Sequence, residues 1–326
     1  MKRRTFLVLA AAFAAAPPIR GEQPVPSHRI GLLMPSTAAV TSNLTAAFEE
    51  GLREHGYVKG RNLAIEYRYS DDYPERIPEL AAGLAQAGVA VIVTTTDTVV
   101  RTVMRHAAKV PIVMVNTSDP VGGGLVKDLA KPGGLVTGLT NLSPEIGRKR
   151  IELLKESVPA LSRLVYLWDP ELAGAVQSYR EIEGAARLLG IDVRSAGVRR
   201  VEDIDAALAG VAASGGTGLI VQAPNPVLYT LRARIAAIAN ERRMPSMFNR
   251  YEYVVAGGLM SYGPDVPDMY RRAAAYVDAI LKGRAPADLP VQQPTKFELS
   301  LNLKTAKTLG LTIPQSVQLR INRVIE

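Results

Sequence analysis

The sequence predicts an α/β fold made of two doubly wound parallel-sheet lobes. Short apolar runs typical of buried strands alternate with amphipathic helical patterns along nearly the whole chain. Alternation of this kind predicts parallel sheets with helices on both faces. The pattern also restarts near residue 143. With 326 residues and 47% hydrophobic composition, the chain is long enough for two ordinary hydrophobic cores.

The first series of elements contains about five strand patterns. It opens with HRIGLLMPS, a short apolar strand, followed by a helix in which Leu44, Phe48 and Leu52 recur at four-residue spacing. Pro74 marks the first turn of the next helix. The other strands are RNLAIEYRYS, VAVIVTTTD, PIVMVNTSDP and GGLVTGLT, and the helices cover about 43–55, 74–87 and 98–108.

The second series begins with a helix whose start is well marked. Ser143 is a helix cap, Pro144 suits the first helical position, and Glu145 lies near the positive end of the helix dipole. About four strands follow, SRLVYLWDP, IDVRSAGV, TGLIVQAPNP and MPSMFNRY, with helices over about 171–189, 201–213 and 228–242. GGLMSYG and an amphipathic helix over about 265–282 come next.

The N-terminus, MKRRTFLVLAAAFAAAPPIRGEQ, is typical of an export signal. A basic start precedes an apolar stretch that is too short for a membrane anchor. We therefore expect residues 1–22 to be a cleaved signal peptide and the mature protein to be periplasmic. Arg3 and Arg4 also occur in twin-arginine signals, so both export routes stay open. Without a cysteine at the cleavage site, no lipid anchor is expected.

Composition excludes several classes of chemistry. The chain has no cysteine, so disulfides, thiolate catalysis and zinc–thiolate sites are ruled out. Its three histidines are scattered without metal-ligand spacing, and no cofactor is expected. The formal charge of +8 lies partly in the leader, and no dense basic run with interleaved aromatics points to nucleic acid. We expect a monomer.

The ends of the predicted strands carry the candidate site, because ligands bind beyond the carboxyl ends of open parallel sheets. The residues there are rich in hydroxyls and amides and lack histidine, which suits a small polar ligand better than proton transfer. Asp97, Thr117 and Arg250 also end strands. The candidate ligand-binding residues are Ser36, Thr95, Thr96, Asn116, Ser118, Asp119, Trp168, Asp169, Asn225, Asn249, Ser261 and Tyr262.

The first lobe is expected to hold a polar end of the ligand. Ser118 and neighbouring backbone N–H groups are expected to bind an anionic or carbonyl group at a helix N-terminus. Ser36, Thr95 and Thr96 would add hydrogen-bond donors. Asp119 could pair with a ligand amine, although it could equally cap the turn that follows it.

The second lobe or the hinge is expected to contribute Trp168, Asn225 and Tyr262. Trp168 is the only tryptophan, and it could stack on a ligand or fill the end of its lobe. Asp169 is the alternative partner for a ligand amine.

Two rival chemistries find little support. Gly122, Gly123 and Gly124 follow a strand, but they match neither the P-loop nor the dinucleotide fingerprint. No G-x-S-x-G elbow occurs either. A paired-carboxylate site of Asp97 and Asp119 is conceivable, because both end adjacent strands.

A resemblance covers nearly the whole mature chain. The segment PIVMVNTSDPVGGGLVKDLAKPGGLVTGLT is similar to PIV…DPVGxGLVxSLxxPGGNVTG of the ABC-transporter substrate-binding proteins. RIGLLMPS, GLREHGYVKGRNLAIEYR, PELAAGLAQAGVAVIVTT and FELSLNLKTAKTLGLTIP also resemble that family. This chain departs from it at Leu135, where asparagine is usual, and at Trp168-Asp169-Pro170, where a strand usually ends in Asn-Pro.

The resemblance implies the type I periplasmic binding fold, in which the chain crosses between the lobes three times and rigid-body closure traps a ligand. We place the crossings near residues 141, 252 and 287. The first lobe would then comprise 28–141 and 253–286, and the second 142–252 and 287–326.

The expected function is that of the substrate-binding component of an ABC uptake transporter. It would capture a small polar or aromatic solute, with amino acids among the candidates, and deliver it to an inner-membrane permease. A periplasmic sensor module for a receptor is the main alternative, and an enzyme on the same frame is a weaker one. A DNA-binding regulator would need a helix-turn-helix module where the leader stands.

Overall fold

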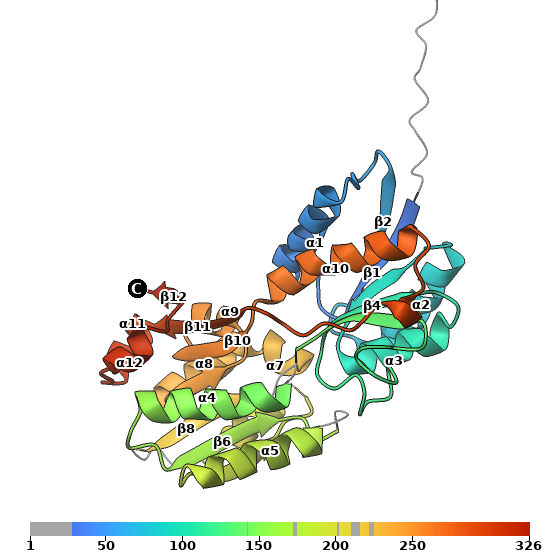
Figure 1. The fold of residues 1–326 in the computed structure, drawn as a ribbon. Helices are drawn as coiled ribbons and strands as arrows, with labels where there is room; N and C mark the ends of the chain where they lie inside the picture. The colour runs from blue at the N-terminus through green and yellow to red at the C-terminus, as the bar shows by residue number, and fades with distance from the viewer. Residues whose placement is uncertain (1–27, 142, 172–174, 201, 210–215, 222–224) are drawn as a thin grey trace, which may run out of the picture.

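The computed structural model describes residues 28–141, 143–171, 175–200, 202–209, 216–221 and 225–326. The expected signal peptide lies outside these residues. Two α/β lobes, each built on its own sheet, lie side by side and are joined by several chain segments (Figure 1). The α/β class predicted from the alternating pattern is confirmed.

The first lobe is built on a five-stranded parallel sheet in the order β2-β1-β3-β4-β5. Helices α1 and α10 cover one face, and α2 and α3 cover the other (Figure 1). The elements are β1 (His28–Met34), α1 (Ser42–Glu54), β2 (Leu63–Tyr69), a 3-10 turn (Pro74–Arg76), α2 (Ile77–Gln86), β3 (Ile92–Thr95), α3 (Asp97–His106), β4 (Ile112–Thr117), β5 (Val136–Thr140), α10 (Val266–Leu281) and a 3-10 turn (Pro286–Asp288).

The second lobe is built on a seven-stranded sheet in the order β12-β11-β10-β9-β8-β6-β7. Strands β10 and β11 are antiparallel, so this sheet is mixed and not purely parallel as predicted. The elements are α4 (Ser143–Ser157), β6 (Arg163–Trp168), α5 (Ala175–Leu188), β7 (Asp192–Gly197), α6 (Asp203–Ala209), β8 (Thr217–Val221), α7 (Pro226–Thr230), α8 (Arg232–Glu241), β9 (Ser246–Phe248), α9 (Tyr251–Val255), β10 (Met260–Pro264), β11 (Phe297–Asn302), α11 (Leu303–Thr308), α12 (Gln315–Gln318) and β12 (Arg323–Ile325).

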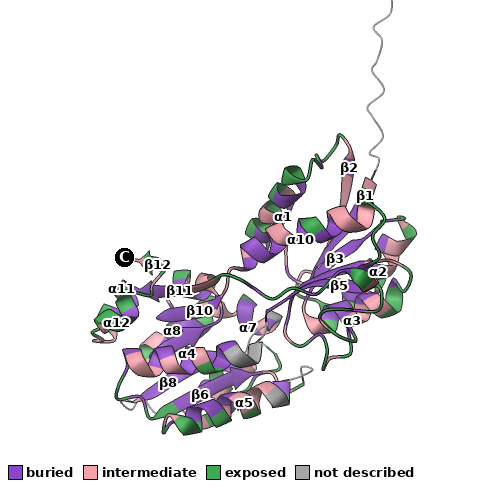
Figure 2. Ribbon diagram, in the orientation of Figure 1, coloured by how far each residue is buried: buried purple, intermediate pink, exposed green. Residues whose placement is uncertain are grey.

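Each sheet is buried on both faces, as the near-continuous apolar strands require. Along β1, Ile30 and Leu32 pack toward α1 and α10, whereas Leu33 packs toward α2 and α3. Figure 2 shows the same layering, with buried strands inside and exposed residues on the outer helix surfaces. Each helix packs its apolar stripe against the sheet and leaves its charged residues in water.

The strand pairing corrects two of the predicted crossings. Residues 253–264 were expected in the first lobe, but β10 pairs with β9 and β11 in the second sheet. The chain returns to the first lobe only after Pro264, where α10 begins. Residues 287–292 were expected in the second lobe, yet the Gln292 N–H donates to the Gly138 carbonyl, and Val291 lies in a first-lobe core. The last passage therefore lies between residue 292 and β11.

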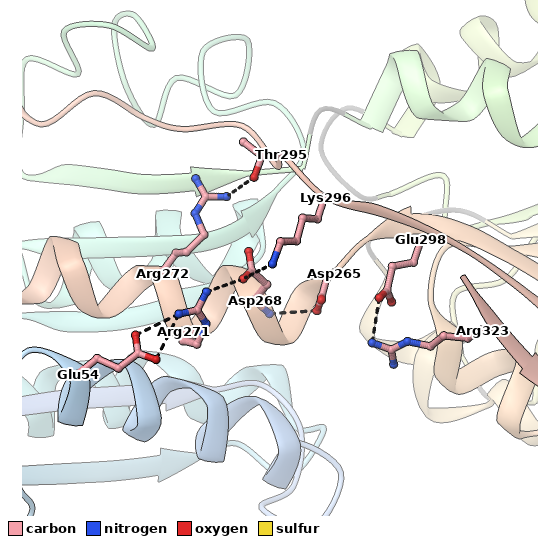
Figure 3. A network of polar contacts seen from close by, with 9 residues as sticks. All are labelled: Glu54, Asp265, Asp268, Arg271, Arg272, Thr295, Lys296, Glu298 and Arg323. Carbon is pink, nitrogen blue, oxygen red and sulfur yellow. Dashed lines mark hydrogen bonds and ion pairs between the residues drawn. The ribbon is translucent and has the colours of Figure 1, made fainter. Parts of the chain in front are cut away.

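An ion-pair network ties the second passage to the last one (Figure 3). Asp268, in the first turn of α10, accepts from Arg271 Nη2 at 2.9 Å and lies 3.5 Å from Lys296 Nζ. Arg271 also pairs with Glu54 of α1 at 3.0 Å. Burial opposes ionisation of Asp268, but the Arg271 hydrogen bond and the nearby positive charges outweigh it and hold the pKa of this carboxyl below its usual value.

Asp268→Asn is expected to lower the free energy of unfolding by about 1 kcal/mol at pH 7, because both cationic partners are largely solvated. The pKa of Asp268 is lower in the folded protein than in the unfolded chain. Its ion pairs therefore add to the free energy of unfolding above about pH 4, and this contribution is lost as the pH falls through the folded-state pKa. Urea unfolding at pH 7 and pH 3 measures this. Asp205→Asn is the control, because the Asp205–Arg234 pair is exposed. An Asp268→Asn deficit that persists undiminished at pH 3 would contradict the account.

Candidate functional site

A pocket lies between the two lobes, at the carboxyl ends of the strands of both sheets. This cleft pocket brings together half of the predicted ligand-binding residues from separate parts of the chain. They are Ser36, Thr95, Thr96 and Asn116 from the first lobe and Asn225 and Asn249 from the second. The volume of about 60 Å³ has room for a few water molecules.

The first-lobe edge of the cleft pocket is shaped by strained backbone. Thr96 has φ 60° and ψ 147°, a conformation that β-branched residues rarely adopt. Asn116 has φ 62° and lies at an irregularity in the pairing of β4 with β5. Its side-chain oxygen accepts a hydrogen bond from Asn141 Nδ2 at 2.9 Å. Strain of this kind persists only where surrounding contacts hold it, and it clusters at binding sites.

Asn249 supplies an unused hydrogen-bond acceptor at the second-lobe edge. The residue is 8% exposed, and its Oδ1 has no hydrogen-bond partner among the described residues. A buried amide oxygen left without a partner costs roughly 1–3 kcal/mol. A ligand N–H or O–H donor in the cleft pocket would recover that free energy.

Arg250, which follows β9, is a largely buried cation of the site. It donates to Glu252 at 2.6 and 3.2 Å, and its guanidinium lies 4.1 Å from the centre of the Tyr229 ring. Burial opposes ionisation of Glu252, but the charge and hydrogen bonds of Arg250 outweigh it and hold the pKa of this carboxyl below its usual value. Burial likewise opposes the charge on Arg250, and Glu252 outweighs it and raises the guanidinium pKa. The pair therefore stays ionised at neutral pH.

The lobes touch along one rim of the cleft. Asp72 of the first lobe accepts from Ser36 Oγ at 2.8 Å and from Thr230 Oγ1 of the second lobe at 3.2 Å. Val40 of the first lobe packs against a second-lobe core. Asn43 of α1 lines the same cavity as Glu252 of the second lobe. These contacts describe a closed arrangement on this side of the cleft.

Ser118 and Asp119 do not offer free donors to a ligand, contrary to prediction. The anion bound by Ser118 and Asp119 is the carboxylate of Asp97 and not a ligand. Asp97 Oδ2 accepts from the Ser118 backbone N–H at 2.9 Å and from Ser118 Oγ at 3.1 Å, and Asp97 Oδ1 accepts from the Asp119 N–H. The Asp119 carboxylate accepts from the Gly122 N–H at 2.8 Å. The local turn role considered for Asp119 is thus the one observed.

Of the two roles considered for Trp168, the structure shows the filling of the lobe end and not the stacking on a ligand. Its ring is 8% exposed, lies 5.1 Å from the Tyr179 ring in a stacked geometry, and donates from Nε1 to Ser195 Oγ at 2.7 Å. It fills the end of the second-lobe core. Trp168 ends β6, as predicted. Alternate residues of a strand face opposite sides of a sheet, and Trp168 faces the side that packs into the second-lobe core.

The remaining predicted residues also lie away from the cleft pocket. Tyr262 packs against the second-lobe core and stacks on Phe297 at 6.0 Å. Asp169 accepts from the Glu171 N–H at 2.9 Å, and burial raises the pKa of its carboxyl. Ser261 lines a different cavity.

The rest of the pocket lining was not assigned from the sequence, and three of its members are tyrosines. It consists of Met34, Pro35, Thr41, Leu44, Tyr229, Arg250, Tyr253, Val266 and Tyr270, of which Arg250 was noted only as a strand end. Burial raises the pKa of Tyr270 to about 12, while its hydrogen bond with Thr95 acts in the opposite direction. The tyrosines lie on helices that follow strand ends, so a rule that reads strand ends passes over them.

The described residues show no group of three or more potential metal ligands, and none of their helices is long and apolar enough to cross a membrane. The arrangement is suited to holding a small molecule by hydrogen bonds, ring contacts and one buried ion pair.

Comparisons with known proteins agree with this geometry. A family model described as ABC transporter substrate-binding protein matches residues 38–325. The tyrosine-binding protein of Clostridioides difficile is 22% identical over 265 residues, which are 81% of this chain and 75% of that protein.

Solved structures give the same result. A conserved domain protein of Vibrio cholerae is 26% identical, with a TM-score of 0.84 over 91% of this chain and 99% of that one. The ABC domain from Streptococcus pneumonia in complex with L-Trp is 24% identical, with a TM-score of 0.85 over 92% of this chain and 100% of that one. These likenesses show the fold.

Proposed function

The chain belongs to the ABC transporter substrate-binding protein family, and on that premise we propose that it captures a free amino acid in the cleft between its lobes. The family resemblance predicted from the sequence is confirmed. We further propose that the protein works in the periplasm, that residues 1–22 direct its export, and that an inner-membrane permease receives the ligand from the closed form.

The observation that carries the proposal is the buried Asn249 oxygen in a pocket lined from both lobes. An amino acid offers an ammonium group that could donate to this oxygen. Its carboxylate can accept from hydroxyl and amide donors of the opposite edge, such as Thr95 and Asn116. The same pocket is lined by Tyr229, which offers a ring to the ligand side chain.

The relatives support the choice of ligand class, since one is named for tyrosine and another was solved with L-Trp. We therefore take L-tyrosine and L-tryptophan as the first probes. Binding would begin from separated lobes and end with closure over the ligand. The contact from Thr230 to Asp72 across the rim belongs to the closed side of this change. Affinity is the gain from closed-state contacts less the cost of closing.

Asn249→Ala is expected to weaken binding of the best amino acid about tenfold or more, because a charge-assisted hydrogen bond is lost. Its folding stability should change little, since the residue's oxygen has no partner to lose within the described structure. Isothermal titration calorimetry on ligand-stripped protein measures the affinity, and urea unfolding measures the stability.

Asn240→Ala is the matched control. Asn240 also has a buried oxygen without a partner in the described structure, but it does not line the cleft pocket. Its substitution should leave the affinity unchanged. If no amino acid binds, or if Asn249→Ala binds as tightly as the parent, the proposal fails. Mass spectrometry of the recovered ligand shows whether it is released unaltered. An enzyme with the same fold would release a chemically changed product.

A further inference from the structure

A second and larger cavity lies behind Asn249 and Arg250, beside the passages between the lobes. This hinge pocket has a volume of about 440 Å³. Its base is formed by β10 and β11, and its walls come from α8, α9 and the start of α10. Asn249 and Arg250 line both cavities and separate them. We propose that the hinge pocket is a second ligand site, which binds a short hydroxycarboxylate.

Ser300 is the first reason to expect a ligand there. It is fully buried, lines the pocket, and its Oγ has no hydrogen-bond partner among the described residues. It lies directly opposite Ser261 in the β10–β11 ladder, and Ser261 lines the pocket as well. The base of the cavity is therefore a pair of serines. A buried hydroxyl without a partner is costly, so a ligand that hydrogen-bonds to it gains free energy.

The charges around the pocket select an anion. Arg250 is neutralised by Glu252, and Arg323 pairs with Glu298 at 3.0 Å (Figure 3). Arg232 is different. Its Nη1 donates to the Tyr229 carbonyl at 3.0 Å and its guanidinium lies 4.8 Å from the Tyr229 ring centre. Within the described parts of the chain, no carboxylate lies within ion-pair distance of Arg232, so a ligand carboxylate is the natural counter-ion.

The carboxylates that line the pocket argue against an ammonium group on the ligand. Glu252 and Glu298 are held by arginines, and Asp265 caps α10 by accepting from the Asp268 N–H at 3.0 Å (Figure 3). What remains is the guanidinium of Arg232 and the hydroxyl of Ser300. A monoanion that carries one or more hydroxyl groups matches this set, and the volume admits a chain of several carbons.

An occupant of the hinge pocket would contact both lobes. Asn43 of α1 and Asp265 to Pro267 of α10 come from the first lobe, and the other lining residues come from the second. Binding there would favour one angle between the lobes. By thermodynamic linkage, binding in the hinge pocket would change the affinity of the cleft pocket for its ligand. Binding in the cleft pocket would change the affinity of the hinge pocket by the same factor.

Calorimetric titration of the protein with D-gluconate, L-malate and L-lactate tests the proposal. At least one of these should bind saturably. Arg232→Gln should weaken that binding about tenfold or more, and Ser300→Ala about threefold or more. Arg234→Gln is the matched control: Arg234 lies on the same helix, pairs with Asp205 at 2.8 Å and does not line the pocket. It should leave the affinity unchanged.

Thr95→Val separates this site from the cleft pocket, because Thr95 lines only the latter. It should weaken binding of the best amino acid and leave hydroxycarboxylate binding intact. Should Ser300→Ala not fold, Arg232→Gln still decides, since that side chain is partly exposed on α8. The proposal is overturned if no probe binds, if Arg232→Gln binds like the parent, or if Thr95→Val abolishes hydroxycarboxylate binding. Amino-acid capture is tested separately, by titrating the parent and Asn249→Ala with amino acids.

Discussion

Replacing Arg250 by methionine is expected to lower the free energy of unfolding by about 3 kcal/mol, because it leaves Glu252 buried without its partner. The ion pair is well shielded: the two side chains are 12% and 24% exposed, and the closest contact is 2.6 Å. Methionine retains much of the volume but loses both hydrogen bonds and the contact with the Tyr229 ring. Urea unfolding at pH 7, followed by circular dichroism, measures the loss.

A double-mutant cycle assigns the effect to the ion pair. Glu252→Gln removes the charge from the other side, and the double variant should be less destabilised than the sum of the single changes. The Arg250→Met deficit should also shrink as the pH falls. The lowered pKa of Glu252 gives the parent an advantage that is present above the usual carboxyl range and is lost below it. Additive costs that do not vary with pH would assign the loss to packing alone.

The fold was largely predictable because both lobes follow the same local rule. Buried parallel strands read as apolar runs, and the helices between them carry one apolar stripe each. The chain crossings were not predictable in the same way. Strand β10 reads as an ordinary apolar strand, and nothing in GGLMSYG indicates which sheet it joins. The pairing with β9 and β11 decides this, and it is a long-range choice.

The candidate site was predictable where the backbone alone positions a residue. Ser36, Thr95 and Asn249 lie in the cleft pocket because the carboxyl ends of parallel strands meet at one edge. Side-chain direction was harder. Trp168 turns into its lobe, and the donors of Ser118 are taken by Asp97, which is 21 residues earlier in the chain but at the end of the neighbouring strand. The adjacency of these two strand ends was a signal that pointed to this contact.

Gly138→Ala is expected to be the most damaging single substitution considered, with a loss of about 4 kcal/mol in the free energy of unfolding. Gly138 lies in β5 directly opposite Met114 of β4 and has φ 133°. A Cβ there would lie 2.0 Å from the Met114 carbonyl oxygen and 2.8 Å from its nitrogen. On its other side, Gly138 accepts the Gln292 N–H from the segment that leads to the last passage. Strand β5 therefore cannot move away from β4 without breaking contacts at the hinge.

The same glycine-to-alanine change at Gly83 is expected to raise the free energy of unfolding. Gly83 lies inside α2, and a Cβ there would meet no atom within 4 Å. Alanine should stabilise that helix by about 0.5–1 kcal/mol, because it restricts the unfolded chain and favours helical backbone. Urea unfolding of both variants by circular dichroism gives the comparison. If Gly138→Ala were as stable as the parent, β4 and β5 could not lie as close as described, and the tie from β5 to the hinge would be wrong. The Gly138→Ala variant thus tests whether β5 is packed tightly between β4 and the segment that leads to the last passage between the lobes.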